Sequence, residues 1–226
     1  MTIATWNLER PQKTNKRIPA IIECIKKNNP DILVLTETTE FIDLGEEYRC
    51  FHSAPLPKDY YKEGERRVSI YSKYKAVKAI ETFRNDRSIC VQFTTPLGDL
   101  AVYGTVIGIY GNRKKDFSED LEQQLKDFER ITAATHFCIA GDLNMSFSDN
   151  YYFTKDGRQK LNASFEKLNL LNLTANIPQN IDHIVVSEAY KYGHKFRVET
   201  WNTDKSLSDH IGVAVVIEYA IHPLRG

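Results

Sequence analysis

Nine short apolar segments, separated by polar turns, run through the whole 226-residue chain. They cover residues 3–7, 32–36, 68–72, 88–94, 100–106, 137–142, 181–187, 196–200 and 211–217, and each has the length and composition of a β-strand. An ordinary sheet holds about four to six strands. The chain is therefore expected to form two sheets rather than one.

Three further segments carry apolar residues at the spacing of an α-helix. They are centred on Ile18, Ile21, Ile22 and Ile25, on Leu121, Leu125 and Phe128, and on Leu161, Phe165 and Leu168. Ser118 stands before the second set with acidic residues after it, so we expect it to cap that helix. Strands mixed with helices predict an α+β fold with two packed sheets and helices on the outside.

The length and composition favour one globular domain. A chain of 226 residues fits one large domain, and no linker, repeat or low-complexity tract interrupts it, so we expect a single domain over residues 1–226. Hydrophobic residues make up 42% and charged residues 27%, which suggests neither a disordered chain nor a membrane protein. The Pro- and charge-rich residues 52–67 predict a surface loop, either functional or a plain connection.

Cysteine spacing and the first residues indicate the compartment. The four cysteines, Cys24, Cys50, Cys90 and Cys138, lie far apart without metal-finger spacing and are expected to be isolated core thiols. The first ten residues lack the pattern of a secretory signal, and no apolar run approaches the ~18 residues of a membrane span. We expect a cytoplasmic monomer without a membrane span.

Polar residues gather where the predicted strands end or begin. They are Asn7, Glu9, Glu37, Asp142, Asn144, Asp182, His183, Asp209 and His210. Each alone is more typical of a turn. Together they supply carboxylates, amides and a histidine, and this inventory matches a phosphoryl-transfer site with Mg²⁺, which prefers oxygen ligands and binds one or two carboxylates plus substrate phosphate.

In these residues the chain resembles the endonuclease/exonuclease/phosphatase superfamily. The matching motifs occur in the family's order as TWNLE at 5–9, LTET at 35–38, GDLN at 141–144, IDHIVVS at 181–187 and SDH at 208–210. The resemblance implies a four-layer α/β/β/α sandwich of two packed mixed β-sheets flanked by helices. It also implies a metal-dependent phosphoesterase, like the abasic-site endonucleases, pancreatic-type deoxyribonucleases and phosphatases of the family.

The resemblance assigns a role to each matching residue. Glu37 would bind Mg²⁺, or Mn²⁺, with Asn7 beside it and Asp209 as a direct or water-mediated ligand. Asp142 would orient or deprotonate the attacking water, and Asn144 would donate a hydrogen bond to the phosphate or to Asp142. His210 would contact a phosphate oxygen, with its imidazole held by Asp182. These types agree with general-base and electrostatic catalysis.

Two positions depart from the family pattern. Glu9 stands where the abasic-site branch has Asp, and it is either a metal ligand or a solvent-facing residue. Thr105 matches a position at which the family delivers a Tyr or a His to the phosphate, and Thr can donate one hydrogen bond there. Outside the set, Trp6 is expected in the core, and Trp201 in the core or at the rim of the cleft. His183 is expected to be a packed or surface residue, because it points away from its neighbour Asp182.

Local charge bears on the substrate, because the 30 basic and 30 acidic residues cancel overall. Arg10, Lys13, Lys16 and Arg17 form one basic stretch and Arg113, Lys114 and Lys115 another, so Arg10 and Arg113 are expected to bind substrate phosphates, unless these residues only populate exposed loops. The adjacent Tyr151 and Tyr152 offer rings on which bases could stack.

Three functions stay open at this stage. The first is a Mg²⁺-dependent nuclease that cleaves DNA by metal-assisted attack of an Asp-activated water, and nucleic acid is the expected partner. The second is a phosphatase or phosphodiesterase acting on a small-molecule or lipid phosphate ester. The third, a binding module without catalysis, is disfavoured because the whole inventory of polar residues is present.

Overall fold

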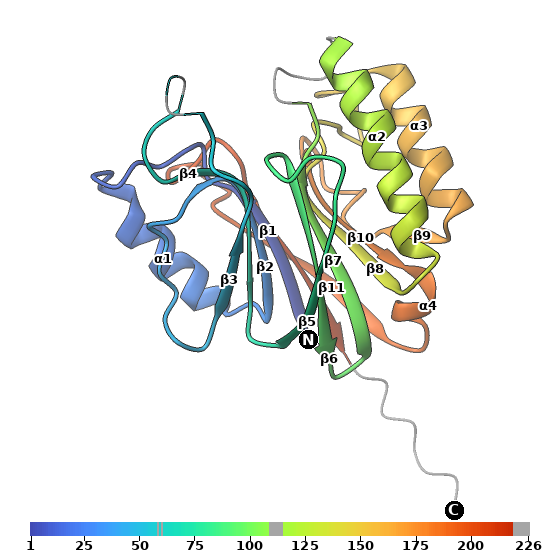
Figure 1. Cartoon of the computed structure of the whole chain (residues 1–226), viewed down its shortest axis with the longest axis horizontal. Helices are drawn as coiled ribbons and strands as arrows, with labels where there is room; N and C mark the ends of the chain where they lie inside the picture. The colour runs from blue at the N-terminus through green and yellow to red at the C-terminus, as the bar shows by residue number, and fades with distance from the viewer. Residues whose placement is uncertain (58, 60, 109–114, 219–226) are drawn as a thin grey trace, which may run out of the picture.

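Two six-stranded mixed sheets form the centre of the computed structural model, which describes residues 1–57, 59, 61–108 and 115–218 (Figure 1). The first sheet has the order β11-β12-β1-β2-β4-β3, with β1 at Thr2–Asn7, β2 at Ile32–Thr39, β3 at Arg49–His52, β4 at Glu65–Ser72, β11 at Lys195–Trp201 and β12 at Gly212–Glu218. The second has the order β5-β6-β7-β8-β10-β9, with β5 at Lys75–Ile80, β6 at Ser88–Thr95, β7 at Gly98–Val106, β8 at His136–Asp142, β9 at Leu170–Asn172 and β10 at Asp182–Ser187.

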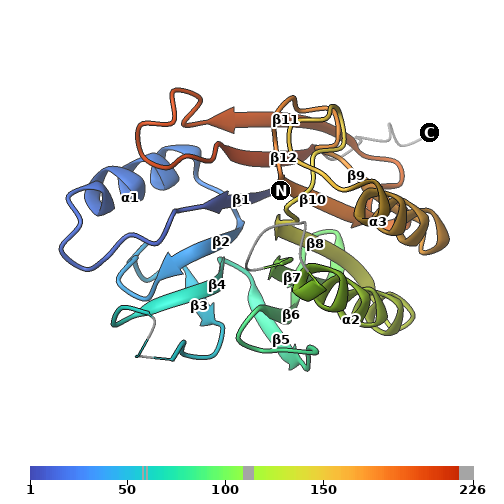
Figure 2. The ribbon, with the colours of Figure 1, turned by 90° about the horizontal axis from the view of Figure 1, so that it is seen from above.

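Helices cover the outer face of each sheet (Figures 1 and 2). Helix α1, Arg17–Asn28, lies on the first sheet, and helices α2, Lys115–Thr132, and α3, Lys155–Lys167, lie side by side on the second. The short helix α4, Glu188–Lys191, follows β10. The order of layers is helix, sheet, sheet, helix, and this confirms the predicted four-layer α+β sandwich.

Apolar side chains fill the space between the sheets and the space under the helices. Val34 and Ile70 from the first sheet share one cluster with Val102 and Ile184 from the second. Trp6 is fully buried on the α1 side of the first sheet, as predicted. Trp201 is also buried and meets Trp6 edge to face, with ring centroids 5.9 Å apart. Buried apolar side chains therefore occupy both the space between the sheets and the space between the first sheet and α1.

Each sheet contains one parallel pair of strands joined by a crossover helix. Strands β1 and β2 are parallel and joined by α1, and strands β7 and β8 are parallel and joined by α2. In open sheets of this kind, ligands bind beyond the carboxyl ends of the parallel strands. Asn7 ends β1 and Asp142 ends β8, and a hydrogen bond joins them. The two carboxyl ends therefore meet at the same end of the sandwich.

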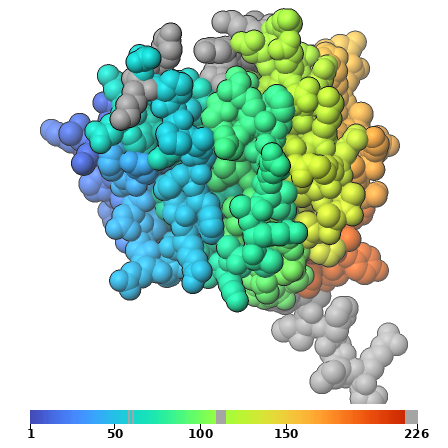
Figure 3. Space-filling view, in the orientation of Figure 1, coloured from blue at the N-terminus to red at the C-terminus, as the bar shows by residue number. Residues whose placement is uncertain are grey.

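The predicted strands are all present, while three others escaped prediction. Strands β3 and β5 are the outer edges of the two sheets, on the face that Figure 3 shows, and β9 is only three residues long. Four of the six residues of β5 are exposed and the other two are half-buried, so it lacks the apolar run that marks a buried strand. The predicted loop 52–67 is shorter than expected, because His52 belongs to β3 and β4 begins at Glu65.

Two other predictions are corrected. Ser118 is not a cap, because it lies inside α2 after Lys115, and Leu168 follows the end of α3 rather than belonging to it. All four cysteines are free thiols; Cys90 and Cys138 are buried as predicted, Cys24 is half-buried, and Cys50 is exposed on the edge strand β3. None of the helices in the described ranges is long and apolar enough to cross a membrane.

Candidate active site

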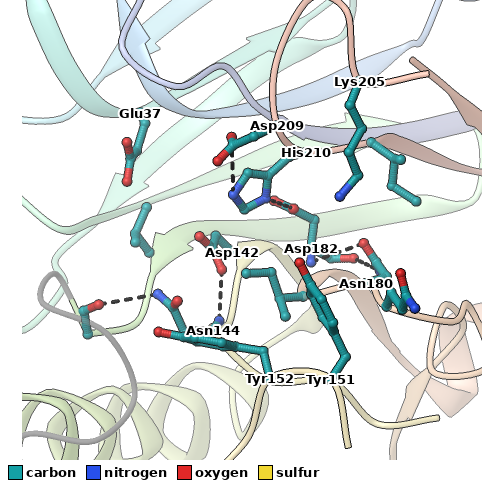
Figure 4. Close-up of a pocket in the computed structure, with 15 residues that line it drawn as sticks. Glu37, Asp142, Asn144, Tyr151, Tyr152, Asn180, Asp182, Lys205, Asp209 and His210 are labelled. Atoms are coloured by element: carbon teal, nitrogen blue, oxygen red, sulfur yellow. Dashed lines mark hydrogen bonds and ion pairs between the residues drawn. The ribbon is translucent and has the colours of Figure 1, made fainter. Parts of the chain in front are cut away.

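A cavity of about 290 Å³ lies at the end of the sandwich where the parallel strands finish. Figure 4 shows that side chains from both sheets point into it. Among the residues predicted from the sequence, those that line it are Glu37, Asp142, Asn144, Asp182, Asp209 and His210. Residues separated by more than 170 positions in the chain therefore surround one space.

Asp142 is an enclosed carboxylate of the cavity, with 3% of its surface exposed. Its Oδ2 accepts a hydrogen bond from Asn7 Nδ2 at 3.2 Å, and its Oδ1 accepts one from the Asn144 main-chain N–H at 2.8 Å. Burial and the facing carboxylate of Asp182 raise the pKa of Asp142 to about 7, although His210 opposes the shift. A carboxylate with a pKa near neutrality is suited to accept a proton.

His210 is held by Asp182 through a short hydrogen bond. The distance from His210 Nδ1 to Asp182 Oδ2 is 2.5 Å, and Nδ1 must donate because the carboxylate can only accept. Burial lowers the pKa of His210, but the carboxylates of Asp182, Asp142 and Asp209 outweigh it and raise the pKa to about 10. His210 is therefore a cation at neutral pH, and its Nε2–H is left for the cavity, 3.8 Å from Asp209 Oδ1.

Asn144 connects Asp142 to the chain that follows β7. Its side-chain Nδ2 donates to the carbonyls of Ile107 and Gly108 at 2.9 and 3.2 Å. Its main-chain N–H, rather than its side chain, supplies the donor to Asp142. Asn144 thus fixes one wall of the cavity in addition to orienting the carboxylate.

Left-handed backbone conformations are concentrated around the cavity. Glu37, Asn144, Gln179 and Lys205 line it and have φ values of 42°, 49°, 52° and 55°. This region is uncommon for residues other than Gly, Asn and Asp, and strain of this kind clusters at functional sites. At Glu37 it redirects a side chain inside β2, whose neighbours Thr36 and Thr38 are fully buried.

Two glycines near the cavity allow their strands to pack closely against neighbouring residues. Gly141 has φ of 138°, and a Cβ there would lie 2.0 Å from the Thr105 carbonyl oxygen. A Cβ on Gly212 would lie 1.9 Å from Trp201, which packs behind the SDH segment. Both positions therefore need a residue without a side chain.

Thr105 and Glu9 are not brought into the cavity. Thr105 is fully buried and donates to Gln124 Oε1 at 2.6 Å, so it faces helix α2, and the next residue, Val106, lines the cavity instead. Glu9 pairs with Arg17 at 2.9 Å, with 48% of its side chain exposed, so the structure gives the solvent-facing alternative.

Asn7 and the basic residues lie around the cavity rather than in its wall. Asn7 is 1% exposed and lies behind Asp142. Arg10 Nε is 3.0 Å from Glu37 Oε2, whereas Lys13 lies over the Phe41 ring at 5.0 Å. Arg113 and Lys114 lie outside the described residues, and Lys115 pairs with Glu119 in α2.

Several lining residues were not predicted from the sequence. They are Val106, Gly108, Gln179, Asn180, Ile181, Lys205 and Ile211. Lys205 stands in the loop before the SDH segment, and Figure 4 places it on the side of His210 opposite Glu37. Tyr151 and Tyr152 also line the cavity, and Tyr151 is 54% exposed. In the sequence, the only indication that Lys205 belongs to the site is its position shortly before the SDH motif.

The donor set suits Mg²⁺ better than a metal that needs many protein ligands. Within the described residues, no three His, Cys, Asp or Glu side chains form a metal-binding cluster. Glu37 and Asp209 nevertheless present two carboxylates to one cavity. Mg²⁺ keeps several waters and uses one or two carboxylates plus substrate phosphate, so two carboxylates are sufficient.

Comparison with known proteins identifies the family. Residues 4–210 match the model of the Endonuclease/Exonuclease/phosphatase family, so the chain belongs to this family, whose members are hydrolases. No curated protein matches the chain in sequence.

Solved structures share the fold at low sequence identity. An AP endonuclease from Archaeoglobus fulgidus superposes with a TM-score of 0.72 at 15% identity, covering 96% of this chain and 99% of that one. An endonuclease/exonuclease/phosphatase from Beutenbergia cavernae has a TM-score of 0.69 at 16% identity, covering 99% and 72%. The endonuclease domain of TRAS1, a telomere-specific non-LTR retrotransposon, has a TM-score of 0.67 at 18% identity, covering 97% and 98%.

Proposed function

We propose that the chain is a Mg²⁺-dependent phosphodiester hydrolase that acts on DNA. The observation that carries the proposal is the enclosed group of Asp142, Asp182 and His210, in which burial raises the pKa of a carboxylate and carboxylates raise the pKa of a histidine. Such a base and such a cation are what water attack on a phosphodiester requires.

In the proposed reaction, Asp142, His210 and Asp182 have different roles. Asp142 accepts a proton from the attacking water, whose oxygen forms the new bond to phosphorus. His210, oriented by Asp182, donates its Nε2–H to a non-bridging phosphate oxygen as negative charge develops there. The bond from phosphorus to the leaving oxygen breaks, and that oxygen takes a proton from solvent or from a neighbouring group.

Glu37 and Asp209, with Asn7 beside them, are the residues proposed to hold Mg²⁺. When bound, the metal supplies Lewis-acid stabilisation of the phosphate and of the leaving oxygen. Asn7 contributes without a metal as well, because its Nδ2–H keeps Asp142 Oδ2 in a fixed direction. Mn²⁺ prefers similar oxygen ligands and is the expected substitute.

DNA is favoured over a small phosphate ester by the surroundings of the cavity. Lys205 lies on the side of His210 opposite Glu37 (Figure 4), and Arg10 pairs with Glu37 at 3.0 Å, so two cations near the reacting groups are available to a polyanion. The exposed ring of Tyr151 offers a base a surface to stack on. Two of the similar structures are endonucleases by their descriptions.

Turnover of four substrates side by side tests the proposal. The substrates are a supercoiled plasmid, an abasic-site duplex, bis-p-nitrophenyl phosphate and a phosphoinositide, each with Mg²⁺ and with EDTA. We expect Mg²⁺-dependent cleavage of DNA, and a Glu37→Gln variant that needs more Mg²⁺ for half-maximal rate because it lacks the charged ligand. Phosphate release from the phosphoinositide with an intact plasmid would instead support the small-ester alternative, and equal rates in EDTA would contradict a metal requirement.

A further inference from the structure

A second cavity of about 280 Å³ adjoins the candidate active site. The described residues that line it are Arg10, Glu37, Leu56, Tyr61, Glu65, Arg66 and Arg67, and Glu37 is the residue that it shares with the first cavity. It contains three guanidinium groups and two carboxylates. If a cation is bound to Glu37, the positive charge of the three arginines exceeds the negative charge of the remaining carboxylate.

Arg67 lies on β4, the strand next to the one that carries Glu37. Strands β2 and β4 are antiparallel, with Thr36 facing Val68 and Thr38 facing Arg66. These two pairs flank Glu37 on β2 and Arg67 on β4, where Glu37 has a left-handed backbone. Both residues line the second cavity, so Arg67 lies close to the proposed metal ligand.

The Arg67 guanidinium is held in place without a carboxylate partner. It lies over the Tyr61 ring at 5.0 Å, and its Nη2 donates to the Tyr61 hydroxyl at 2.5 Å. In the described part of the chain, no Asp or Glu forms an ion pair with it, whereas the neighbouring Arg66 is bound by Glu40 at 2.7 Å and by the Ser53 carbonyl at 3.1 Å. Arg67 therefore keeps its charge and donors for a ligand.

A planar guanidinium with open donors binds phosphate better than a lysine does, because two parallel N–H groups match two phosphate oxygens. Arg10 adds a second cation to the same cavity, and 58% of its side chain is exposed. One side chain, Glu37, separates this cavity from the reacting groups. A substrate with adjacent phosphates would thus place one phosphate at Asp142 and the next at Arg67.

We propose that the second cavity is a phosphate subsite, in which Arg67 binds the phosphate next to the one that is hydrolysed. This inference rests on the proposed function for the identity of the first cavity. It assigns the preferred substrate class as polynucleotides, or other compounds with two neighbouring phosphates, rather than isolated phosphodiesters. Arg67 is then a binding residue whose contribution appears only when the second phosphate is present.

The test compares the thymidine dinucleotide TpT with its 5′- and 3′-phosphorylated forms, pTpT and TpTp. Turnover is measured with Mg²⁺ and binding is measured in EDTA by calorimetry. Three variants are compared with the native chain: Arg67→Gln removes the charge, Arg67→Lys keeps it, and Lys191→Gln removes a cation that also lies over an aromatic ring, 4.8 Å from the centre of Phe196, in the distant helix α4.

We expect the native chain to have a KM for pTpT or TpTp at least about 10-fold below that for TpT, as one charge-assisted phosphate contact provides. Arg67→Gln should abolish this advantage while kcat and KM for TpT stay unchanged, Arg67→Lys should restore part of it, and Lys191→Gln should have no effect. Equal KM values for the three dinucleotides in the native chain, or an equal loss on TpT, would overturn the inference.

The binding measurement separates this inference from the proposed function. If pTpT binds more tightly than TpT in EDTA and Arg67→Gln removes the difference, the subsite exists even if no dinucleotide is hydrolysed, and then only the proposed function fails. If all dinucleotides are hydrolysed without any preference that depends on Arg67, the function stands and the subsite is wrong.

Discussion

His183 is fully buried and His210 is half-buried, and both lie next to Asp182, the first along the chain and the second across the cavity. His183 is fully buried on the other face of β10, where its Nε2 lies 2.9 Å from the Met145 carbonyl and its Nδ1 3.1 Å from the Thr174 hydroxyl. Burial lowers the pKa of His183 to about 4, whereas carboxylates raise the pKa of His210 to about 10.

Burial lowers the pKa of both rings, and the difference in sign arises from the carboxylates that face His210. The Met145 carbonyl can only accept a hydrogen bond, so Nε2 of His183 carries the proton, and Nδ1 of the neutral ring faces the Thr174 hydroxyl. His210 instead donates to the Asp182 carboxylate and faces Asp142 and Asp209. Alternation along β10 sends Asp182 and His183 to opposite faces, and of the two only Asp182 lines the cavity.

Removal of His210 should have the largest effect on turnover. We expect His210→Ala to lower kcat for phosphodiester cleavage by at least about 100-fold, because a positioned donor to the phosphate is lost. The matched variant His183→Leu should keep kcat within about threefold of the native value, since His183 contacts none of the reacting groups. Equal losses in the two variants would mean that the rings do not differ in role. Circular dichroism would establish that both variants are folded.

Removal of His183 should have a smaller effect than removal of His210, and it should change stability rather than turnover. We expect His183→Leu to reduce the free energy of unfolding by about 2 kcal/mol at pH 7, because the buried Met145 carbonyl loses its donor. Urea unfolding in EDTA measures this change. An unchanged midpoint and slope would contradict the hydrogen-bonded role of His183.

The same unfolding experiment has a pH dependence of opposite sign for the two histidines. The folded pKa of His183 lies below the unfolded value of about 6.5, so its stabilisation is present above that value and is lost as the pH falls through about 4. The folded pKa of His210 lies above the unfolded value, so its stabilisation is present below pH 6.5 and is lost as the pH rises through about 10. The free energy of unfolding of the native chain minus that of His183→Leu should therefore become smaller in acid. A difference that becomes larger in acid would contradict this assignment.

The sequence predicts those parts of the fold that have strong local patterns. Strands such as β8, which is buried over all but its first residue, are recognisable alone, whereas β5 at a sheet edge is largely exposed and is not. The residues of the cavity occur in the family's order, and the structure brings Glu37, Asp142, Asp182 and His210 together. The buried strands and the order of the site motifs can therefore be predicted from a single sequence.

Features that depend on pairing between strands were not predictable in the same way. Thr105 and Val106 differ by one position, and a shift of one residue exchanges the face of the sheet to which a side chain points. That Arg67 and Glu37 line one cavity follows only from the pairing of β2 with β4. The left-handed conformation of Glu37 likewise follows from its tertiary surroundings and not from its residue type.

The hydrolytic assignment depends on His210 being a cation that Asp182 holds beside Asp142. NMR titration of the imidazole signals in EDTA measures its charge directly, and the variants His210→Ala and His183→Leu assign two of the six histidines. We predict that His210 stays protonated up to about pH 9 while His183 stays neutral down to about pH 5. A His210 that loses its proton at or below its ordinary pKa of about 6.5 would contradict the assignment.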